Sequence, residues 1–347
     1  MNPWVMFILI ASLGLGTTIT FASSHWLLAW MGLEINTLAI IPLMAQQHHP
    51  RAVEATTKYF LTQAAAAALM LFATTSNAWI IGEWQIQQLS HPLTATVTMI
   101  SLGMKIGLAP THLWLPEVLQ GLDLTTGLIL STWQKLAPMT LIYQLAPNVD
   151  TAILLLIGLA STLIGGWGGL NQTQLRKILA YSSIAHMGWM IIVLKYSPEL
   201  MLLNLAIYII MTSTAFMTLK VVSATNINAL ATVWTKAPTM ITIAMLTMLS
   251  LGGLPPLTGF MPKWMILQEL TKQDLPTTAT IMALAALLSL FFYLRLCYSM
   301  TLTSGPNTTN NKSPWRLKPT ITSLLPLMAT ISLVMLPITP TAMALLA

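Results

Sequence analysis

Charged residues are scarce in this sequence. Only 7% of the 347 residues are Asp, Glu, Lys or Arg, whereas soluble domains have about a quarter, and 55% are hydrophobic. The mean hydropathy is +0.74. Apolar segments of about 18 to 24 residues can cross a hydrocarbon core of roughly 30 Å as helices. The composition therefore excludes a soluble globule and predicts an all-α polytopic membrane protein.

Cysteine and cofactor-binding motifs are also nearly absent. A single cysteine, Cys297, excludes an internal disulfide and a cysteine-ligated zinc or iron–sulfur site built from this chain alone. The sequence contains no GxGxxG, GxxxxGK[ST], HExxH or CxxC motif. No two interior histidines share a predicted span, as haem ligation would require. We therefore expect this chain to bind no cofactor or metal of its own.

The basic residues also exclude one class of partner. The formal net charge is +6, but the 15 Lys and Arg residues are scattered over loops and span ends and form no dense basic tract. We therefore expect no nucleic-acid partner and interpret these charges as topology signals.

Hydropathy predicts about eleven membrane spans in a single membrane domain over residues 1–347. Their approximate limits are 3–22, 25–44, 54–76, 93–118, 124–145, 149–170, 174–195, 199–221, 238–270, 277–300 and 321–345. Lys and Arg gather on one side if the N-terminus lies there, which the positive-inside rule favours. That side carries Arg51, Lys58, Arg176, Lys177, Lys220, Lys236, Arg295, Lys312, Arg316 and Lys318, against Lys195 and Lys272 opposite. An odd number of spans then places the C-terminus on the other side.

Two of these spans are predicted to be broken. Pro110 interrupts the span that contains SLGMKIGLAP, from Ser101, and Pro255 and Pro256 interrupt the one that contains SLGGLPPLTG, from Ser250. The two motifs are five spans apart, so they cross the bilayer in opposite directions. This pattern predicts two inverted five-helix repeats, residues 3–145 and 149–300, followed by a C-terminal helix at 321–345, with the functional site at the broken helices.

Four ionisable residues lie deep in predicted spans: Glu34, Lys105, Lys135 and Lys263. A charge in hydrocarbon is costly and usually marks an ion or proton pathway, although a structural ion pair or a snorkelling lysine is the alternative. A lysine can take up and release a proton when a carboxylate partner approaches and departs. By contrast, Glu54 and Lys58 have the spacing of an ordinary surface pair, and we expect Glu117 to be solvated at a span end.

Two histidines also lie in the interior. His112 follows the first predicted break, and His186 lies in a polar stripe with Tyr181, Ser182 and Ser183 that could hold a short water chain. Histidine titrates near neutrality and therefore suits proton relay. A histidine that packs between helices and bonds to a neighbouring carbonyl is the equally weighted alternative for each.

Six ordered segments carry a resemblance that runs over nearly the whole chain. They are WMGLEINTLAIIPLM, TKYFLTQA, GMKIGLAPTHLWLPEV, STWQKLAP, RKILAYSSIAHMGWM and LSLGGLPPLTGFMPKW. Together they resemble subunit 2 of the NADH dehydrogenase of animal mitochondria, an antiporter-like membrane subunit of respiratory complex I. The chain departs from the wider family's usual fourteen helices, as if three N-terminal helices were absent.

The resemblance implies a role for each buried charge. Glu34 corresponds to the family's glutamate, Lys105 to the broken-helix lysine, Lys135 to the central lysine and Lys263 to the terminal residue of the path, while His112 and His186 match histidines along the hydrophilic axis. It also implies that NADH, FMN, iron–sulfur clusters and ubiquinone belong to other subunits. The implied partners are other membrane and accessory subunits of the complex, together with lipids such as cardiolipin.

The resemblance places the chain in the mitochondrial inner membrane, with its N-terminus in the matrix and its C-terminus in the intermembrane space. The expected function is proton translocation coupled to electron transfer elsewhere in the complex. Two alternatives stay open. One is a stand-alone cation/proton antiporter, and the other is a structural spacer whose charges are merely paired.

Overall fold

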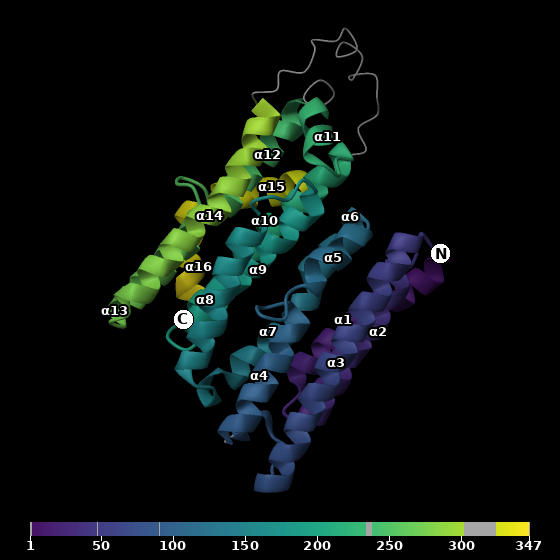
Figure 1. Ribbon diagram of the computed structural model, residues 1–347, viewed down its shortest axis with the longest axis vertical. Coiled ribbons are helices and arrows are strands. Elements are labelled where there is room, and N and C mark those ends of the chain that lie inside the picture. Colours follow the sequence, from purple (N-terminus) through teal and green to yellow (C-terminus); the bar gives the residue numbers. More distant parts are fainter. Residues whose placement is uncertain (1, 47, 90, 234–237, 302–323, 347) are drawn as a thin grey trace. The chain divides into compact units, whose positions relative to one another are not determined.

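The computed structural model describes residues 2–46, 48–89, 91–233, 238–301 and 324–346, which are helical apart from loops and two isolated β-bridges (Figure 1). The α-helices are α1 (Pro3–Ala22), α2 (Trp26–Met44), α3 (Pro50–Ile81), α4 (Pro92–Ile106), α5 (Trp114–Gly121), α6 (Leu124–Ser131), α7 (Trp133–Leu145), α8 (Thr151–Gly168), α9 (Leu175–Val193), α10 (Pro198–Val222), α11 (Ile227–Thr232), α12 (Pro238–Gly252), α13 (Phe260–Lys272), α14 (Pro276–Thr301), α15 (Leu324–Val334) and α16 (Thr339–Leu346). Short 3₁₀ turns are η1 (Ile86–Gln88), η2 (Ala146–Asn148) and η6 (Leu336–Ile338).

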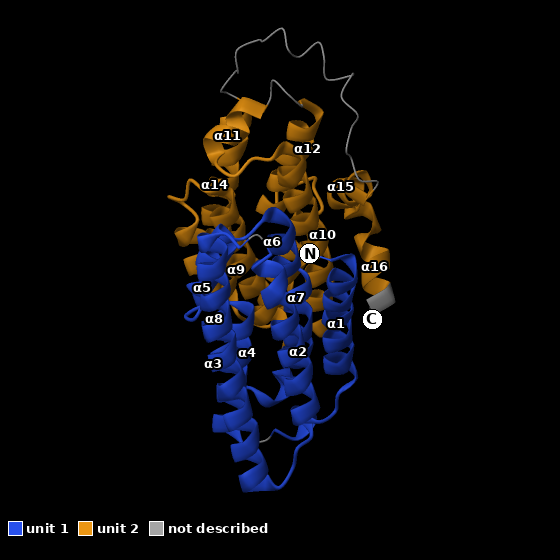
Figure 2. Cartoon of the chain, turned by 90° about the vertical axis from the view of Figure 1, so that its right-hand side faces the viewer, with its two compact units in different colours: residues 1–160 blue, residues 161–347 orange. Residues whose placement is uncertain are grey.

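The chain forms two compact units, residues 1–160 and 161–347 (Figure 2). In the first unit α1 packs on α2, α2 on α3, and α3 on both α4 and α5, while α7 contacts α1, α2 and α4. In the second unit α10 packs on α9, α12, α15 and α16, and α14 packs on α11, α12 and α13. Helix α9 is buried along almost its whole length. The two repeats expected over 3–145 and 149–300 remain a prediction.

Six helices in the described part of the chain are long and apolar enough to cross a membrane by themselves: α1, α2, α3, α8, α10 and α14. The pair α15 and α16 satisfies the same test as one span bent by 67°. Several other predicted spans consist of two shorter helices, so the architecture is a polytopic bundle with interrupted segments. Lys236, Lys312, Arg316, Lys318 and residues 321–323 of the last predicted span lie outside the described residues.

Prolines begin many of these helices. Pro3, Pro50, Pro92 and Pro198 each occupy the first turn of their helix, where the missing N–H is not needed and the fixed φ favours the helix. The residue before Pro50, His49, caps α3 by accepting a hydrogen bond from the Arg51 N–H through Nδ1 at 3.2 Å. The span predicted at 54–76 begins four residues later than α3 does, because Arg51, Glu54 and Lys58 delay the apolar run that hydropathy detects.

The two predicted breaks are present, but each helix ends before its proline. Helix α4 stops at Gly107, with φ +87°, and α12 stops at Gly253, with φ +81°. This left-handed conformation closes each helix, since its N–H bonds back to a carbonyl of the last turn. The following Ala109–Pro110 and Pro255–Pro256 peptide bonds are both cis.

The span expected at 124–145 contains an interruption that hydropathy did not predict. Helix α6 ends at Ser131 and α7 begins at Trp133, with Thr132 between them at φ −112° and ψ −69°. The Thr132 hydroxyl donates to the carbonyl of Leu128 at 2.7 Å, which also accepts the backbone N–H of Thr132 at 3.0 Å. Pro138, inside α7, has no N–H to donate to the carbonyl of Gln134, four residues earlier. Lys135 consequently lies in the first turn of a new helix.

Candidate functional site

An ion pair between a buried lysine and a partly exposed glutamate joins α2 and α4. The Nζ atom of Lys105 lies 3.5 Å from Oε1 of Glu34, and the side chain of Lys105 is only 2% exposed, whereas that of Glu34 is 25% exposed. The other carboxylate oxygen of Glu34 accepts a hydrogen bond from the Thr37 hydroxyl at 3.3 Å. The structure thus brings together the acid and the broken-helix lysine that the sequence singled out.

Lys105, but not Glu34, lines a small cavity that also reaches Lys135. The space open to the centre of a water molecule is about 20 Å³, and one water needs roughly 10–15 Å³. Lys135 is 3% exposed. The lining residues are Leu33, Asn36, Thr37, Tyr59, Gln63, Lys105, Ile106, Trp114, Leu115, Leu130, Gln134, Lys135 and Pro138. Two buried lysines from α4 and α7 therefore share one cavity large enough for water.

Helix α3 contacts both halves of the first broken helix near this cavity. The Gln63 amide donates to the carbonyl of Lys105, at the end of α4, over 3.4 Å. One turn earlier, the ring of Tyr59 meets that of Trp114, the first residue of α5, edge to face at 5.7 Å. The indole N–H of Trp114 in turn donates to the carbonyl of Met104 at 3.0 Å. These contacts satisfy two carbonyls at the end of α4 and fix the angle of the break.

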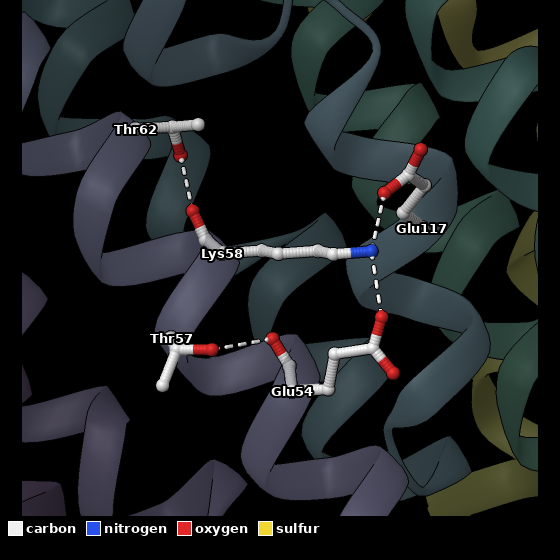
Figure 3. A network of polar contacts seen from close by, with 5 residues as sticks. All are labelled: Glu54, Thr57, Lys58, Thr62 and Glu117. Atoms are coloured by element: carbon white, nitrogen blue, oxygen red, sulfur yellow. Dashed lines mark hydrogen bonds and ion pairs between the residues drawn. The ribbon is translucent and has the colours of Figure 1, made fainter.

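A surface network extends the contact between α3 and α5 (Figure 3). The ammonium of Lys58 lies 2.8 Å from a carboxylate oxygen of Glu54 and 2.8 Å from one of Glu117. The expected Glu54–Lys58 pair is therefore confirmed. Glu117, expected as a solvated residue at a span end, is 53% exposed and in addition links α5 to α3. All three side chains are partly exposed, so solvent screens the network.

His112 lies in the segment between α4 and α5 and does not line the cavity. It is 7% exposed, and its Nδ1 lies 3.2 Å from the carbonyl of Pro110. This is the contact of a histidine that packs against a neighbouring carbonyl, the alternative weighed from the sequence.

Lys263 follows the second break and has a different kind of partner. Its Nζ donates to the carbonyls of Leu251 at 3.1 Å and Gly252 at 2.9 Å, at the carboxyl end of α12, where the helix dipole favours a cation. The absence of a side chain at Gly253 makes room, since a Cβ there would lie 2.9 Å from Cδ of Lys263.

The two breaks are equivalent in a register that the sequence motifs did not indicate. When Gly107 is matched with Gly253, the equal spacing matches Pro110 with Pro256 and the first residue of α5 with that of α13. The same register matches Glu117 with Lys263. Lys105 precedes its break and Lys263 follows its own, so the two lysines are not equivalent residues.

His186 lies on α9 with a tilted contact to Tyr208 of α10, at 5.6 Å between ring centroids. Tyr208 interacts with Ser183, and Tyr293 of α14 interacts with Ser182. Tyr181, which the predicted stripe included, instead packs its ring against Gly168 of α8. The polar stripe is thus completed by tyrosines from two other helices.

Sequence reasoning missed the neutral polar residues of the cavity, Asn36, Gln63 and Gln134. Asn36 and Gln134 are sequence neighbours of Glu34 and Lys135, and Gln63 contacts Lys105. A neutral polar residue in an apolar span near a buried charge is the sequence signal that would have indicated them. Among the described residues, no group of three or more His, Cys, Asp or Glu side chains could hold a metal ion.

Comparison with known proteins gives one consistent family. The family described as NADH:quinone oxidoreductase/Mrp antiporter matches residues 23–289, and that of the NADH dehydrogenase subunit 2 C-terminus matches residues 290–343. NADH-ubiquinone oxidoreductase chain 2 of Formosania lacustris is 70% identical over 99% of both chains, and that of Danio rerio is 70% identical over 98% of both.

A solved structure agrees with this result. A chain of respiratory complex I from Thermus thermophilus with bound aureothin has a TM-score of 0.86 and 25% identity, covering 99% of this chain and 80% of that one. The antiporter-like helical fold and the sequence relationship thus point to the same group. The chain belongs to the NADH-ubiquinone oxidoreductase chain 2 family.

Proposed function

We propose that this chain translocates protons as a membrane subunit of NADH:ubiquinone oxidoreductase, respiratory complex I. The observation that carries the proposal is that Lys105, which pairs with Glu34, lines a cavity that Lys135 also lines. Buried ionisable residues in membrane proteins are costly, and a cavity that admits water supplies the route that a proton needs.

The mechanism is electrostatic. While Glu34 is close, its carboxylate stabilises the ammonium of Lys105 in a poorly screened interior. When Glu34 turns away, that ammonium loses its counter-charge, and its proton passes through water in the cavity to Lys135. We infer the continuation past His186 to Lys263, and the contribution of His112 near the break, from the family resemblance.

The wider setting belongs to the same proposal. The chain lies in the mitochondrial inner membrane beside other complex I subunits, with its N-terminus in the matrix and its C-terminus in the intermembrane space. It has about eleven spans in two inverted repeats. Redox chemistry, with NADH, FMN, iron–sulfur clusters and ubiquinone, takes place in other subunits. Lipids such as cardiolipin contact its outer surface.

The test is Lys105→Met in the assembled complex, reconstituted into sealed vesicles. Protons translocated per NADH oxidised are measured, with Lys272→Met as the control because Lys272 is 62% exposed and pairs only with Glu269 in the described part of the chain. We expect Lys105→Met to lower the ratio or to block turnover, and the control to leave both unchanged. An unchanged ratio at normal turnover in Lys105→Met would favour the spacer function. Cation turnover by the isolated chain would favour the stand-alone antiporter.

A further inference from the structure

Asn36 has a buried carboxamide whose polar atoms lack protein partners. The residue lies on α2 and is 2% exposed. Neither Nδ2 nor Oδ1 has a hydrogen-bond partner among the described residues. Buried polar groups are nearly always satisfied, by protein or by an ordered water, because an unsatisfied one is costly.

On one side the carboxamide lies close to α1. It packs against Gly16 of α1, where a Cβ would lie 2.4 Å from Oδ1 of Asn36. On the other side, the backbone carbonyl of Asn36 accepts a hydrogen bond from the Gln134 amide at 3.2 Å, which ties α2 to the first turn of α7. Asn36 thus lies between α1 and α7. Its partner on α7, Gln134, is the residue that precedes Lys135 in the sequence.

The same residue lines the cavity that Lys105 and Lys135 share. That cavity has room for a water molecule, and Asn36, Gln63 and Gln134 make part of its wall polar. We propose that Asn36 binds a water molecule that stands between Lys105 and Lys135. The inference deepens the proposed function and rests on it for its role in proton transfer.

A carboxamide suits this role because it offers a donor and an acceptor and stays neutral. It can therefore hold a water in either orientation without taking the proton itself. In the transfer, charged Lys105 gives a proton to the water while the water gives one of its own to neutral Lys135. The water is regenerated and the lysines exchange charge states.

The experiment compares Asn36→Leu with Asn77→Leu in the assembled complex. Asn77 is the matched control, because it is fully buried in the same unit, its Nδ2 also lacks a partner among the described residues, and it does not line the cavity. A high-resolution structure of each complex reports ordered water, and reconstituted vesicles report protons per NADH oxidised. We expect water density in the cavity of the unaltered complex and of Asn77→Leu, and its loss in Asn36→Leu with at least a threefold lower proton ratio.

Asn36→Ser separates water binding from packing, since serine keeps a donor and an acceptor in a smaller side chain. We expect Asn36→Ser to retain the ordered water and more than half of the protons translocated per NADH oxidised. A dry cavity in the unaltered complex, or an Asn36→Leu variant that keeps both water and ratio, overturns the inference, as does an equal loss in Asn36→Leu and Asn77→Leu. Water at Asn36 together with an unchanged ratio in Lys105→Met would instead reject the proposed function and leave the water site standing.

Discussion

The ammonium nitrogen of Lys263 lies 2.9 Å from the carbonyl oxygen of Gly252, so this lysine caps the carboxyl end of α12. The described residues place no carboxylate within ion-pair distance of it. Lys105, in contrast, faces the carboxylate of Glu34. A backbone carbonyl neither ionises nor swings on a side chain, whereas a glutamate can do both. Of the two lysines, only Lys105 therefore has a partner that can be withdrawn.

Replacing Lys263 tests its capping role. Lys263→Met removes the donor from two buried carbonyls, and leaving a buried acceptor unsatisfied costs about 1–3 kcal/mol. We expect the thermal midpoint of the purified complex to fall. Lys263→Arg retains donors and should lose less. Equal midpoints for Lys263→Met and the unaltered complex would show that water replaces the cap.

Gly253→Ala tests the space beside this lysine. The left-handed backbone strains any non-glycine residue by about 1–3 kcal/mol, and the new methyl group would also meet the Lys263 side chain. Gly82→Ala is the matched control, because Gly82 has φ +83° but nothing within 4 Å of its Cβ position. We expect the midpoint to fall further for Gly253→Ala. Equal decreases would mean that Lys263 moves aside without cost.

Glu34→Gln tests the carboxylate of the ion pair. It leaves a lysine that is 2% exposed without its anion, while Glu34 itself is a quarter exposed. We expect the free energy of unfolding to fall by about 2 kcal/mol, a value between those for exposed and for buried ion pairs. The proton ratio in vesicles should fall, and Glu34→Asp should retain part of it. Glu83→Gln, at an exposed loop glutamate, is the control. A normal ratio in Glu34→Gln contradicts the electrostatic mechanism.

The Lys58 network predicts a difference between two similar variants. Glu54 pairs with Lys58 within α3, whereas Glu117 reaches it from α5. Glu117→Gln should therefore lower the thermal midpoint more than Glu54→Gln, because only the former releases one helix from another. In about 1 M salt, where the screening length is about 3 Å, the difference should disappear. A difference that persists in high salt would point to packing and not to charge.

Arg295 predicts a residue-specific requirement in the second unit. Its two terminal guanidinium nitrogens donate to the carbonyls of Leu170 and Gln172, in the loop after α8. A lysine cannot donate to both carbonyls with a planar guanidinium, so Arg295→Lys should lower the free energy of unfolding by about 1–2 kcal/mol. Faster cleavage of that loop by a protease would report the loss. Arg51→Lys, at an exposed arginine, should leave the cleavage rate unchanged.

The bundle was largely predictable because hydropathy reports which segments cross a membrane. The limits expected for the first span coincide with α1, and both broken spans were identified from their prolines. The helix ends at Gly107 and Gly253 were missed because a left-handed glycine, and not the proline, terminates each helix. The interruption at Thr132 has no glycine or proline to mark it, and its hydroxyl bond to the preceding turn also occurs inside continuous helices, as at Thr212, so the sequence gives no signal for it.

The site was predictable in its charges and less so in its geometry. The Glu34–Lys105 pair follows from the cost of a buried charge, and the resemblance indicated it directly. The carbonyl cap of Lys263 and the tyrosines around His186 arise from tertiary packing, which spacing along one helix cannot reveal. The same holds for Asn36, whose importance depends on a cavity formed by residues distant in sequence.

Helix α3 contacts α5 through Tyr59 and Lys58 and α4 through Gln63, so one continuous helix joins both halves of an interrupted span. A displacement of α3 would therefore act on the Lys105 carbonyl and on Trp114 together, so α4 and α5 would tilt as a unit. Such a movement would reach the ammonium of Lys105 through the backbone of its own helix.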